Sequence, residues 1–518
     1  MQKISKELNK NKTLIENIFK DNPNFIAKEL TIFGKSACIY FMEGLIDATY
    51  LADYVLKPCL KYKDENFDAL NKEINKSNKK ATKNNLSNLK TQINKSSKSS
   101  NIIDYILKNI LIIGKLEVND DLDALVKEVT KGKGIMFVDT CSKYIILDLE
   151  KVQQRAITEP PTSAVAKGPR AGFVENIKTN ISCIRKILAT NNLKIETTNV
   201  GKYSNTMIAV MYIEGIADKK IVNAIMEKIK KINIDGIIDS YYVASFLEEH
   251  KYSIFREVGQ SEKPDIVSAK MLEGRVTILV DGSPIALTLP FMLFEDLQSS
   301  NDYYSENSHS SFVRILRFLS ILITIALPGV YIAIQLHHYK AFPLKFLVTI
   351  INTTQDLPLT PFLEMLLVLI LFEILYEASL RMPKYMGIAM SIVGALILGD
   401  TAVKAGLVSP PSVMIVAVSG ITLYTVPDQS EQISILRFVF TVVGGILGIY
   451  GMVLFGLYLL IYLNDFDSYG VSYLSPYAPY YEEDTKDGIF QRDLLMMRKR
   501  PKSLHNKNKT RIRRWKKC

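Results

Sequence analysis

The chain has 518 residues, enough for two to four domains, and carries 64 Lys and Arg against 53 Asp and Glu. This composition excludes collagen-like and wholly disordered proteins, and the length excludes a mini-protein held together by disulfides. The five cysteines form no Cys-x-x-Cys pair and no zinc-type spacing with histidine. We therefore expect small core cysteines in a reducing compartment, with no metal and no cofactor.

The net charge of +11 is unevenly placed along the chain. Residues 71–100 hold eight Lys and one Glu, and residues 486–518 hold 13 Lys and Arg and two Asp, so the rest of the chain is acidic. Segment 71–100 has no aromatic residue to bury or to stack on bases. We expect a disordered Asn/Lys-rich insertion there, and no nucleic-acid partner.

Residues 1–150 predict a first small α/β subdomain. The expected elements are helices over 1–33, 45–56, 101–113 and 121–131 and strands over 36–42, 135–138 and 144–149. The N-terminus lacks the apolar centre of a signal peptide. This subdomain is therefore expected on the cytoplasmic side.

Residues 151–311 predict a second α/β subdomain. Its first segment holds Pro160-Pro161 and Gly168-Pro169, which forbid a regular helix. Beyond Gly172, apolar residues at helical spacing predict one buried helix face, made of Phe173, Ile177, Ile181, Ile184 and Leu188. A strand over 206–213, a helix over 219–231 capped by Asp218, and a hairpin over 275–289 complete the subdomain.

Residues 312–464 predict an all-α polytopic membrane domain. Runs 318–339, 405–427 and 438–464 contain no charged residue, and each is long enough to cross a hydrocarbon core of about 20 helical residues. A helix over 361–378 and a short span or half-helix over 386–398 form a more polar middle. The basic tail, 465–518, is expected in the cytoplasm by the positive-inside rule. Because both ends lie inside, we expect an even number of crossings, four among four to five membrane helices.

Three carboxylates in the polar middle are candidates for an ion path. Glu373 and Glu377 lie four residues apart on one helix face, and Glu364 lies about 180° around the same helix. Carboxylates within a membrane are costly and usually face protein or water. The alternative is buried pairing with Arg381, Lys384 or Lys404, or a place near the interface.

Other motifs favour structural interpretations. Gly34-Lys35-Ser36 lacks the first glycine of a phosphate-binding loop, and His337-His338 lacks a third metal ligand. Gly444 and Gly448 form a GxxxG pattern that predicts close helix packing, within one chain or between subunits. No Ser/His/Asp or Cys/His grouping emerges, so we do not expect an enzyme.

Four blocks of sequence carry a resemblance to a known family. They are residues 155–180 (RAITEPPTSAVAKGPRAGFVENIKTN), residues 238–240 with 262–265 and 272–290, residues 302–304 with 327–331, and residues 377–383 with 402–409. In this order they resemble the A subunits of GerA-type spore germinant receptors, from about residue 35 to residue 476. Ser163 and Ala171 stand where the family usually has acidic residues. The Asn, Lys and Ile bias is typical of clostridial proteins.

The resemblance implies a multi-pass protein of the inner spore membrane with its N-terminal region facing the spore core. It implies germinant receptor B and C subunits as partners, a homo-oligomer of A subunits with a central ion path, and release of monovalent cations in response to nutrients. Arg155, Glu159, Arg170 and Asn180 are candidates for a subunit-interface network, with an intradomain salt-bridge set as an equal alternative.

The sequence thus predicts an α/β N-terminal cytoplasmic region of two subdomains, followed by an all-α polytopic membrane domain. We expect a non-enzymatic receptor subunit that forms or gates a cation channel. The alternatives are a secondary transporter, although no internal repeat appears across 312–464, and a membrane scaffold that recruits the channel.

Overall fold

The computed structural model describes residues 4–20, 22, 24–62, 102–111, 116–149, 167–381, 394 and 399–512. The predicted insertion at 71–100, Arg155, Glu159 and most of segment 386–398 lie outside these residues. The chain divides into two compact units, one made of residues 1–164, 169–247 and 260–288 and one made of residues 165–168, 248–259 and 289–518. The predicted domain limits at residues 150, 311 and 464 stay predictions.

The first subdomain is built on a five-stranded antiparallel sheet in the order β1-β2-β4-β5-β3. Its strands are β1 (Phe25–Ile32), β2 (Lys35–Met42), β3 (Leu116–Asn119), β4 (Gly134–Val138) and β5 (Tyr144–Leu147). Its helices are α1 (Leu8–Ile18), α2 (Ala48–Leu51), η1 (Ala52–Leu56), α3 (Lys57–Lys61), α5 (Ile102–Tyr105), η2 (Ile106–Ile110) and α6 (Leu122–Thr130).

The predicted helix over 1–33 is wrong beyond residue 18. Residues 25–32 form β1, which pairs with β2 from Phe25 opposite Met42 to Ile32 opposite Lys35. Phe33 and Gly34 join the two strands, both with positive φ, as two-residue hairpin turns require. Gly34-Lys35-Ser36 therefore belongs to a hairpin and not to a phosphate-binding loop.

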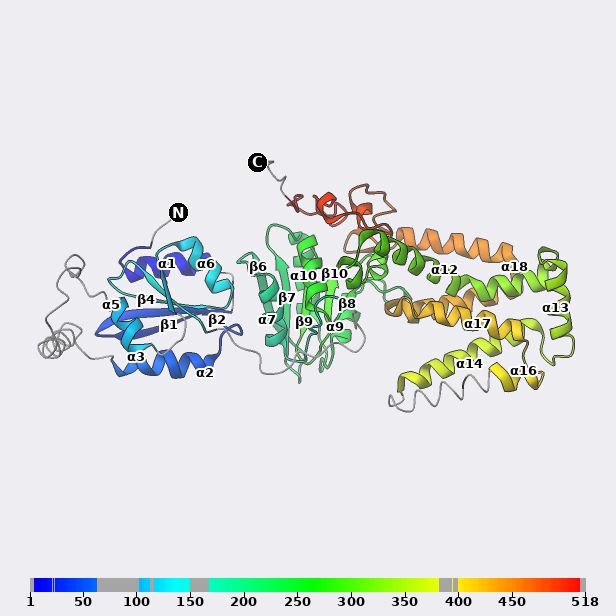
Figure 1. Cartoon of the computed structure of the whole chain (residues 1–518), viewed down its shortest axis with the longest axis horizontal. Helices are drawn as coiled ribbons and strands as arrows, with labels where there is room; N and C mark the ends of the chain where they lie inside the picture. Colours follow the sequence, from blue (N-terminus) through cyan, green and yellow to red (C-terminus); the bar gives the residue numbers. More distant parts are fainter. Residues whose placement is uncertain are drawn as a thin grey trace, which may run out of the picture. The chain divides into compact units, whose positions relative to one another are not determined.

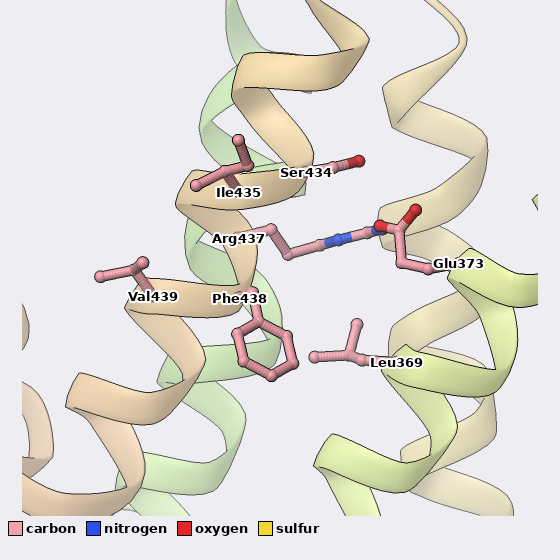
Figure 2. A pocket seen from close by; sticks show the side chains of 7 residues that line it. All are labelled: Leu369, Glu373, Ser434, Ile435, Arg437, Phe438 and Val439. Atoms are coloured by element: carbon pink, nitrogen blue, oxygen red, sulfur yellow. The ribbon is translucent and has the colours of Figure 1, made fainter. Parts of the chain in front are cut away.

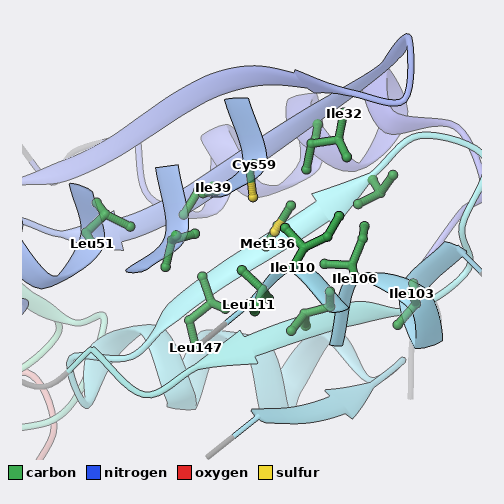
Figure 3. Close-up of a cluster of buried hydrophobic side chains, with 14 of the residues drawn as sticks. Ile32, Ile39, Leu51, Cys59, Ile103, Ile106, Ile110, Leu111, Met136 and Leu147 are labelled. Carbon is green, nitrogen blue, oxygen red and sulfur yellow. The ribbon is translucent and has the colours of Figure 1, made fainter. Parts of the chain in front are cut away.

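Both faces of this sheet are buried, which explains the continuous apolar runs of β2, β4 and β5. One face, shown in Figure 3, packs Ile39 and Met136 against Cys59, Ile106 and other residues of the helices between β2 and β3. Alternate residues of the same strands face α1 and α6 on the other side. The result is a three-layer α/β/α sandwich.

The second subdomain repeats this architecture with a sheet in the order β6-β7-β9-β10-β8. Its elements are α7 (Ile177–Ile187), β6 (Leu193–Val200), β7 (Thr206–Ile213), α8 (Lys219–Lys231), α9 (Ser240–Leu247), β8 (Gly259–Ser261), α10 (Pro264–Glu273), β9 (Val276–Val280) and β10 (Ala286–Leu289). The predicted burial is confirmed, because all five residues from Phe173 to Leu188 lie in one buried cluster, but the helix begins only at Ile177, so Phe173 joins this cluster from the segment before α7. Asp218 accepts a hydrogen bond from the Lys220 amide at 3.0 Å, which confirms the predicted cap.

The second compact unit is mainly helical (Figure 1). Its helices are η3 (Leu293–Leu297), α11 (Ser300–Tyr303), α12 (Asn307–His337), η4 (Tyr339–Ala341), α13 (Leu344–Thr354), α14 (Pro361–Arg381), α16 (Ala402–Lys404), α17 (Pro410–Leu423), η6 (Pro427–Gln429) and α18 (Ser430–Asp465). Two described helical runs, α12 and Pro427–Asp465, are long and apolar enough to cross a membrane. The predicted run 405–427 gives only the 14-residue α17, about 21 Å long, because Pro410 and Pro411 start the helix late.

Helix α18 turns back on itself at Gly448. This residue has φ 65° and ψ −162°, which interrupts the helix. The rings of Phe440 and Phe455 lie 5.1 Å apart between centroids, whereas a straight helix would separate their positions by about 22 Å. Residues 430–447 and 449–465 are therefore two arms of a helical hairpin, and the expectation of one straight span over 438–464 is wrong.

The tail folds onto the start of α12. It contains β11 (Asp467–Ser468), β12 (Val471–Ser472), η7 (Asp484–Lys486) and η8 (Leu494–Met496). The buried Arg314 side chain donates to Asp302 at 3.0 Å, to Asp487 at 2.9 Å and to the Gly488 carbonyl at 2.8 Å. Burial opposes the charge of Asp302, but hydrogen bonds from Arg317 and Arg314 outweigh it and lower the pKa of this carboxyl.

Candidate functional site

An ion pair between a buried arginine and a half-exposed glutamate joins α14 to the first arm of α18. Figure 2 shows Glu373 and Arg437 pointing toward each other beside a cavity of about 320 Å³. Arg437 is 1% exposed, and its Nη2 donates to the Glu373 carboxylate, whose side chain is 36% exposed. Apolar residues Leu369, Ile435 and Phe438 line much of the cavity. Glu373, Arg437 and Ser434 are thus the polar residues that line a mainly apolar cavity.

The same arginine reaches two further helices through a chain of hydroxyl groups. Arg437 Nη1 donates to Ser419 Oγ of α17 at 3.2 Å, and Ser419 Oγ donates to the Thr324 carbonyl of α12 at 3.1 Å. This carbonyl lacks its usual helical partner, because Pro328 four residues later has no N–H. The Thr324 and Thr422 hydroxyls lie 2.7 Å apart. The Arg437 relay, meaning Glu373, Arg437, Ser419, Thr324 and Thr422, therefore connects α14, α18, α17 and α12.

The other two candidate carboxylates lie in different surroundings. Glu364 is fully buried, and its Oε1 accepts hydrogen bonds from the Ser409 amide at 2.7 Å and hydroxyl at 2.6 Å, at the start of α17. Its Oε2 has no hydrogen-bond partner among the described residues. Glu377 is exposed and pairs with Arg381 at 2.5 Å. The three carboxylates thus have different partners, and their ion-path role stays a prediction.

Arg437 was not predicted as a site residue, because it lies immediately before the uncharged run 438–464 and not within it. A signal was present, since Arg437 is the only basic residue of α18. A lone arginine inside a long apolar helix needs a buried acceptor, and the three carboxylates of α14 were the candidates.

The two predicted glycines have different roles in the hairpin. A Cβ on Gly444 would lie 2.6 Å from the Gly329 carbonyl oxygen, so this glycine allows α18 to approach α12 closely. Gly448 is the turn itself. His337 Nε2 lies 3.0 Å from the Gly445 carbonyl, beside this turn.

Of the predicted interface network, Arg170 and Asn180 lie among the described residues. Arg170 is exposed, while Asn180 is 1% exposed and binds the backbone of the segment just before its own helix. Asn180 Oδ1 accepts from the Val174 amide at 2.8 Å, and its Nδ2 donates to the Val174 carbonyl at 2.5 Å. The interface role of these residues, with Arg155 and Glu159, stays a prediction.

We predict that Asn180→Ala destabilises the protein by about 1–3 kcal/mol, because both polar groups of Val174 lose their partner in a buried loop. Chemical denaturation followed by circular dichroism measures this change. Arg170→Ala is the control, with an expected change within about 0.5 kcal/mol because the side chain is exposed. Equal stability of the two variants would contradict the clamp role of Asn180.

Comparison with known proteins identifies the family. The sequence matches the model of the family described as Bacillus/Clostridium GerA spore germination protein over residues 13–503. The chain belongs to the GerA family. It is 36% identical over 415 residues to spore germination protein KA of Bacillus subtilis, covering 80% of this chain and 76% of that one. It is 35% identical over 385 residues to spore germination protein A1 of the same organism, covering 74% and 79%.

A solved structure is also similar. The N-terminal domain of the A subunit of the Bacillus megaterium spore germinant receptor GerK3 matches 56% of this chain and 96% of that domain, with 25% identity and a TM-score of 0.38. The resemblance read from the four sequence blocks is confirmed by the family match. The GerA homologues support a germinant receptor role, and they are not known as enzymes.

Proposed function

We propose that this protein is the A subunit of a nutrient germinant receptor in the inner spore membrane, where it forms or gates a monovalent-cation channel. The GerA family match supports the receptor role. The proposal places the N-terminal region and the tail on the spore-core side of a multi-pass helical domain. It includes B and C subunits and further copies of the A subunit as partners.

The Arg437 relay is the observation that carries the gating proposal. Four helices meet through one nearly buried guanidinium, so a shift of α14 against α18 breaks the pair between Glu373 and Arg437. In the paired state the carboxylate is neutralised and attracts no cation. When the pair opens, Glu373 presents a negative charge to the adjoining cavity. A signal received by a partner subunit would act on this equilibrium by favouring the unpaired arrangement.

Cation release from spores tests this proposal. We predict that Glu373→Gln changes the nutrient-triggered release rate of monovalent cations by about 5-fold or more, because the ion pair holding the paired state is lost. Glu431→Gln is the control, because it removes an exposed carboxylate in the first turn of α18 that is not a candidate for the ion path. Unchanged release by the Glu373 variant at normal protein level would reject the gating role.

Electrical recording separates the channel from its alternatives. The reconstituted protein with its B and C partners is expected to give channel-like currents. Substrate uptake without such currents would favour a secondary transporter. A complex that conducts only when a separate channel protein is added would favour a scaffold.

A further inference from the structure

The tail presents a cluster of apolar side chains to its surroundings. Phe490, Leu494, Leu495 and Met496 are 61%, 54%, 64% and 58% exposed. On the surface of a soluble protein, a loop rarely exposes several neighbouring large apolar side chains unless they bind a partner. We call residues 490–496 the tail loop.

The charges beside the tail loop are mostly positive. Arg492 lies within it, and Arg498 and Lys499 follow it, all exposed, although Lys499 is paired with Glu483 at 2.9 Å. Asp493 is the acidic residue of the tail loop. Its Oδ1 accepts a hydrogen bond from the Leu495 amide at 3.1 Å and so caps the 3₁₀ turn η8. An apolar tip with a basic rim matches the boundary between acyl chains and anionic headgroups.

The tail loop is fixed to the start of α12. The Gln491 amide donates to Ser311 Oγ at 3.0 Å, and this hydroxyl lies 3.2 Å from the Gln491 carbonyl. Arg314, one turn further, holds Asp487 and Gly488. Helix α12 has 31 residues, about 46 Å, whereas a hydrocarbon core is about 30 Å thick. Because Arg314 and Arg317 lie in its first turns and the uncharged run starts only at Phe318, we place these first turns beyond the core, in the headgroup region.

We propose that the tail loop inserts Leu494, Leu495 and Met496 into the membrane leaflet at the start of α12, with Arg492 and Arg498 bound to anionic lipid phosphates. The tail is then a lipid-dependent anchor of the helix that leads into the bundle. The occupant is a phospholipid and not another protein, because the loop lies at the end of a spanning helix and its rim has the charge that anionic headgroups attract. This inference rests on the proposed crossing of the membrane by α12.

Spin-label depth measurements on the full chain test the anchor. The protein is reconstituted in nanodiscs of phosphatidylcholine with or without phosphatidylglycerol, with Cys518→Ser and one added cysteine per sample. The four described cysteines are buried. Labels are placed by Leu495→Cys in the loop, by Glu482→Cys as an exposed control in the same tail, and by Leu322→Cys as a reference for the spanning part of α12.

The label at position 495 is expected to be accessible to oxygen and protected from a water-soluble nickel chelate. Its accessibility to the chelate should lie between the accessibilities measured at positions 482 and 322. The protection of the label at position 495 from the chelate should decrease in nanodiscs without phosphatidylglycerol. It should also decrease when Arg492→Gln and Arg498→Gln are combined. Chelate access at 495 equal to that at 482 would overturn the anchor. Protection from both reagents in every lipid would also overturn it, because it would mean a protein cover. An aqueous label at 322 would instead reject the membrane crossing itself.

Discussion

Replacing Arg437 by Met is expected to destabilise the helical bundle by about 3 kcal/mol, because it leaves Glu373 without its cation and Ser419 without a donor. The expected cost is at the low end for a broken buried pair, since the Glu373 side chain is 36% exposed and water replaces part of the lost interaction. Reversible unfolding of the purified protein in detergent, followed by circular dichroism, measures the change.

Two further variants separate the ion pair from simple packing. Arg381→Met removes the cation of the exposed pair on the same helix as Glu373, with an expected cost of about 0–1 kcal/mol. Glu373→Met combined with Arg437→Met removes both charges, and it is expected to recover part of the stability lost in Arg437→Met. If Arg437→Met and Arg381→Met cost the same, the relay does not hold the four helices together.

Gly444→Ala is expected to destabilise the bundle by about 2 kcal/mol, because the new Cβ would lie 2.6 Å from the Gly329 carbonyl oxygen and 2.9 Å from Met452 Sδ. The backbone atom cannot rotate away, so α12 and α18 must separate. The same unfolding experiment measures the loss.

Gly456→Ala is the matched control within the same helix. Among the described residues, nothing beyond the backbone of its own helix and its chain neighbours lies within 4 Å of the added Cβ, so this change is expected to be neutral or to stabilise by up to about 1 kcal/mol through the better helix propensity of alanine. Gly448→Ala is expected to cost about 1–2 kcal/mol for a different reason, its positive φ. A Gly444→Ala variant as stable as Gly456→Ala would show that the helices are not closely packed at this point.

The α/β elements were largely predictable because their signals are local. The helix face from Ile177 to Leu188 follows from residue spacing, and the Asp218 cap follows from one side chain beside its own helix. Strand β1 was not predictable in this way. Its residues include Lys28 and Glu29, which are both exposed on this edge strand and resemble a helix surface in sequence; only the pairing with β2 decides the conformation.

The candidate site was predictable in its carboxylates and not in their partners. Glu364, Glu373 and Glu377 stand out because charge is rare in an apolar sequence. Their partners depend on which helices pack together, and Ser409 and Arg437 are 45 and 64 residues away from Glu364 and Glu373. The turn at Gly448 was hidden for a related reason, since hydropathy counts apolar residues and does not record a single left-handed φ.

The turn at Gly448 also determines whether residues 430–465 make an odd or an even number of passages. Leu436 of the first arm and Leu463 of the second arm belong to one buried cluster with Phe255 and Phe291. The run therefore leaves the bundle at the end where it entered. Whatever surrounds the helices, residues 430–465 contribute an even number of passages, two or none, and the tail emerges on the side where the run began irrespective of its lysines and arginines.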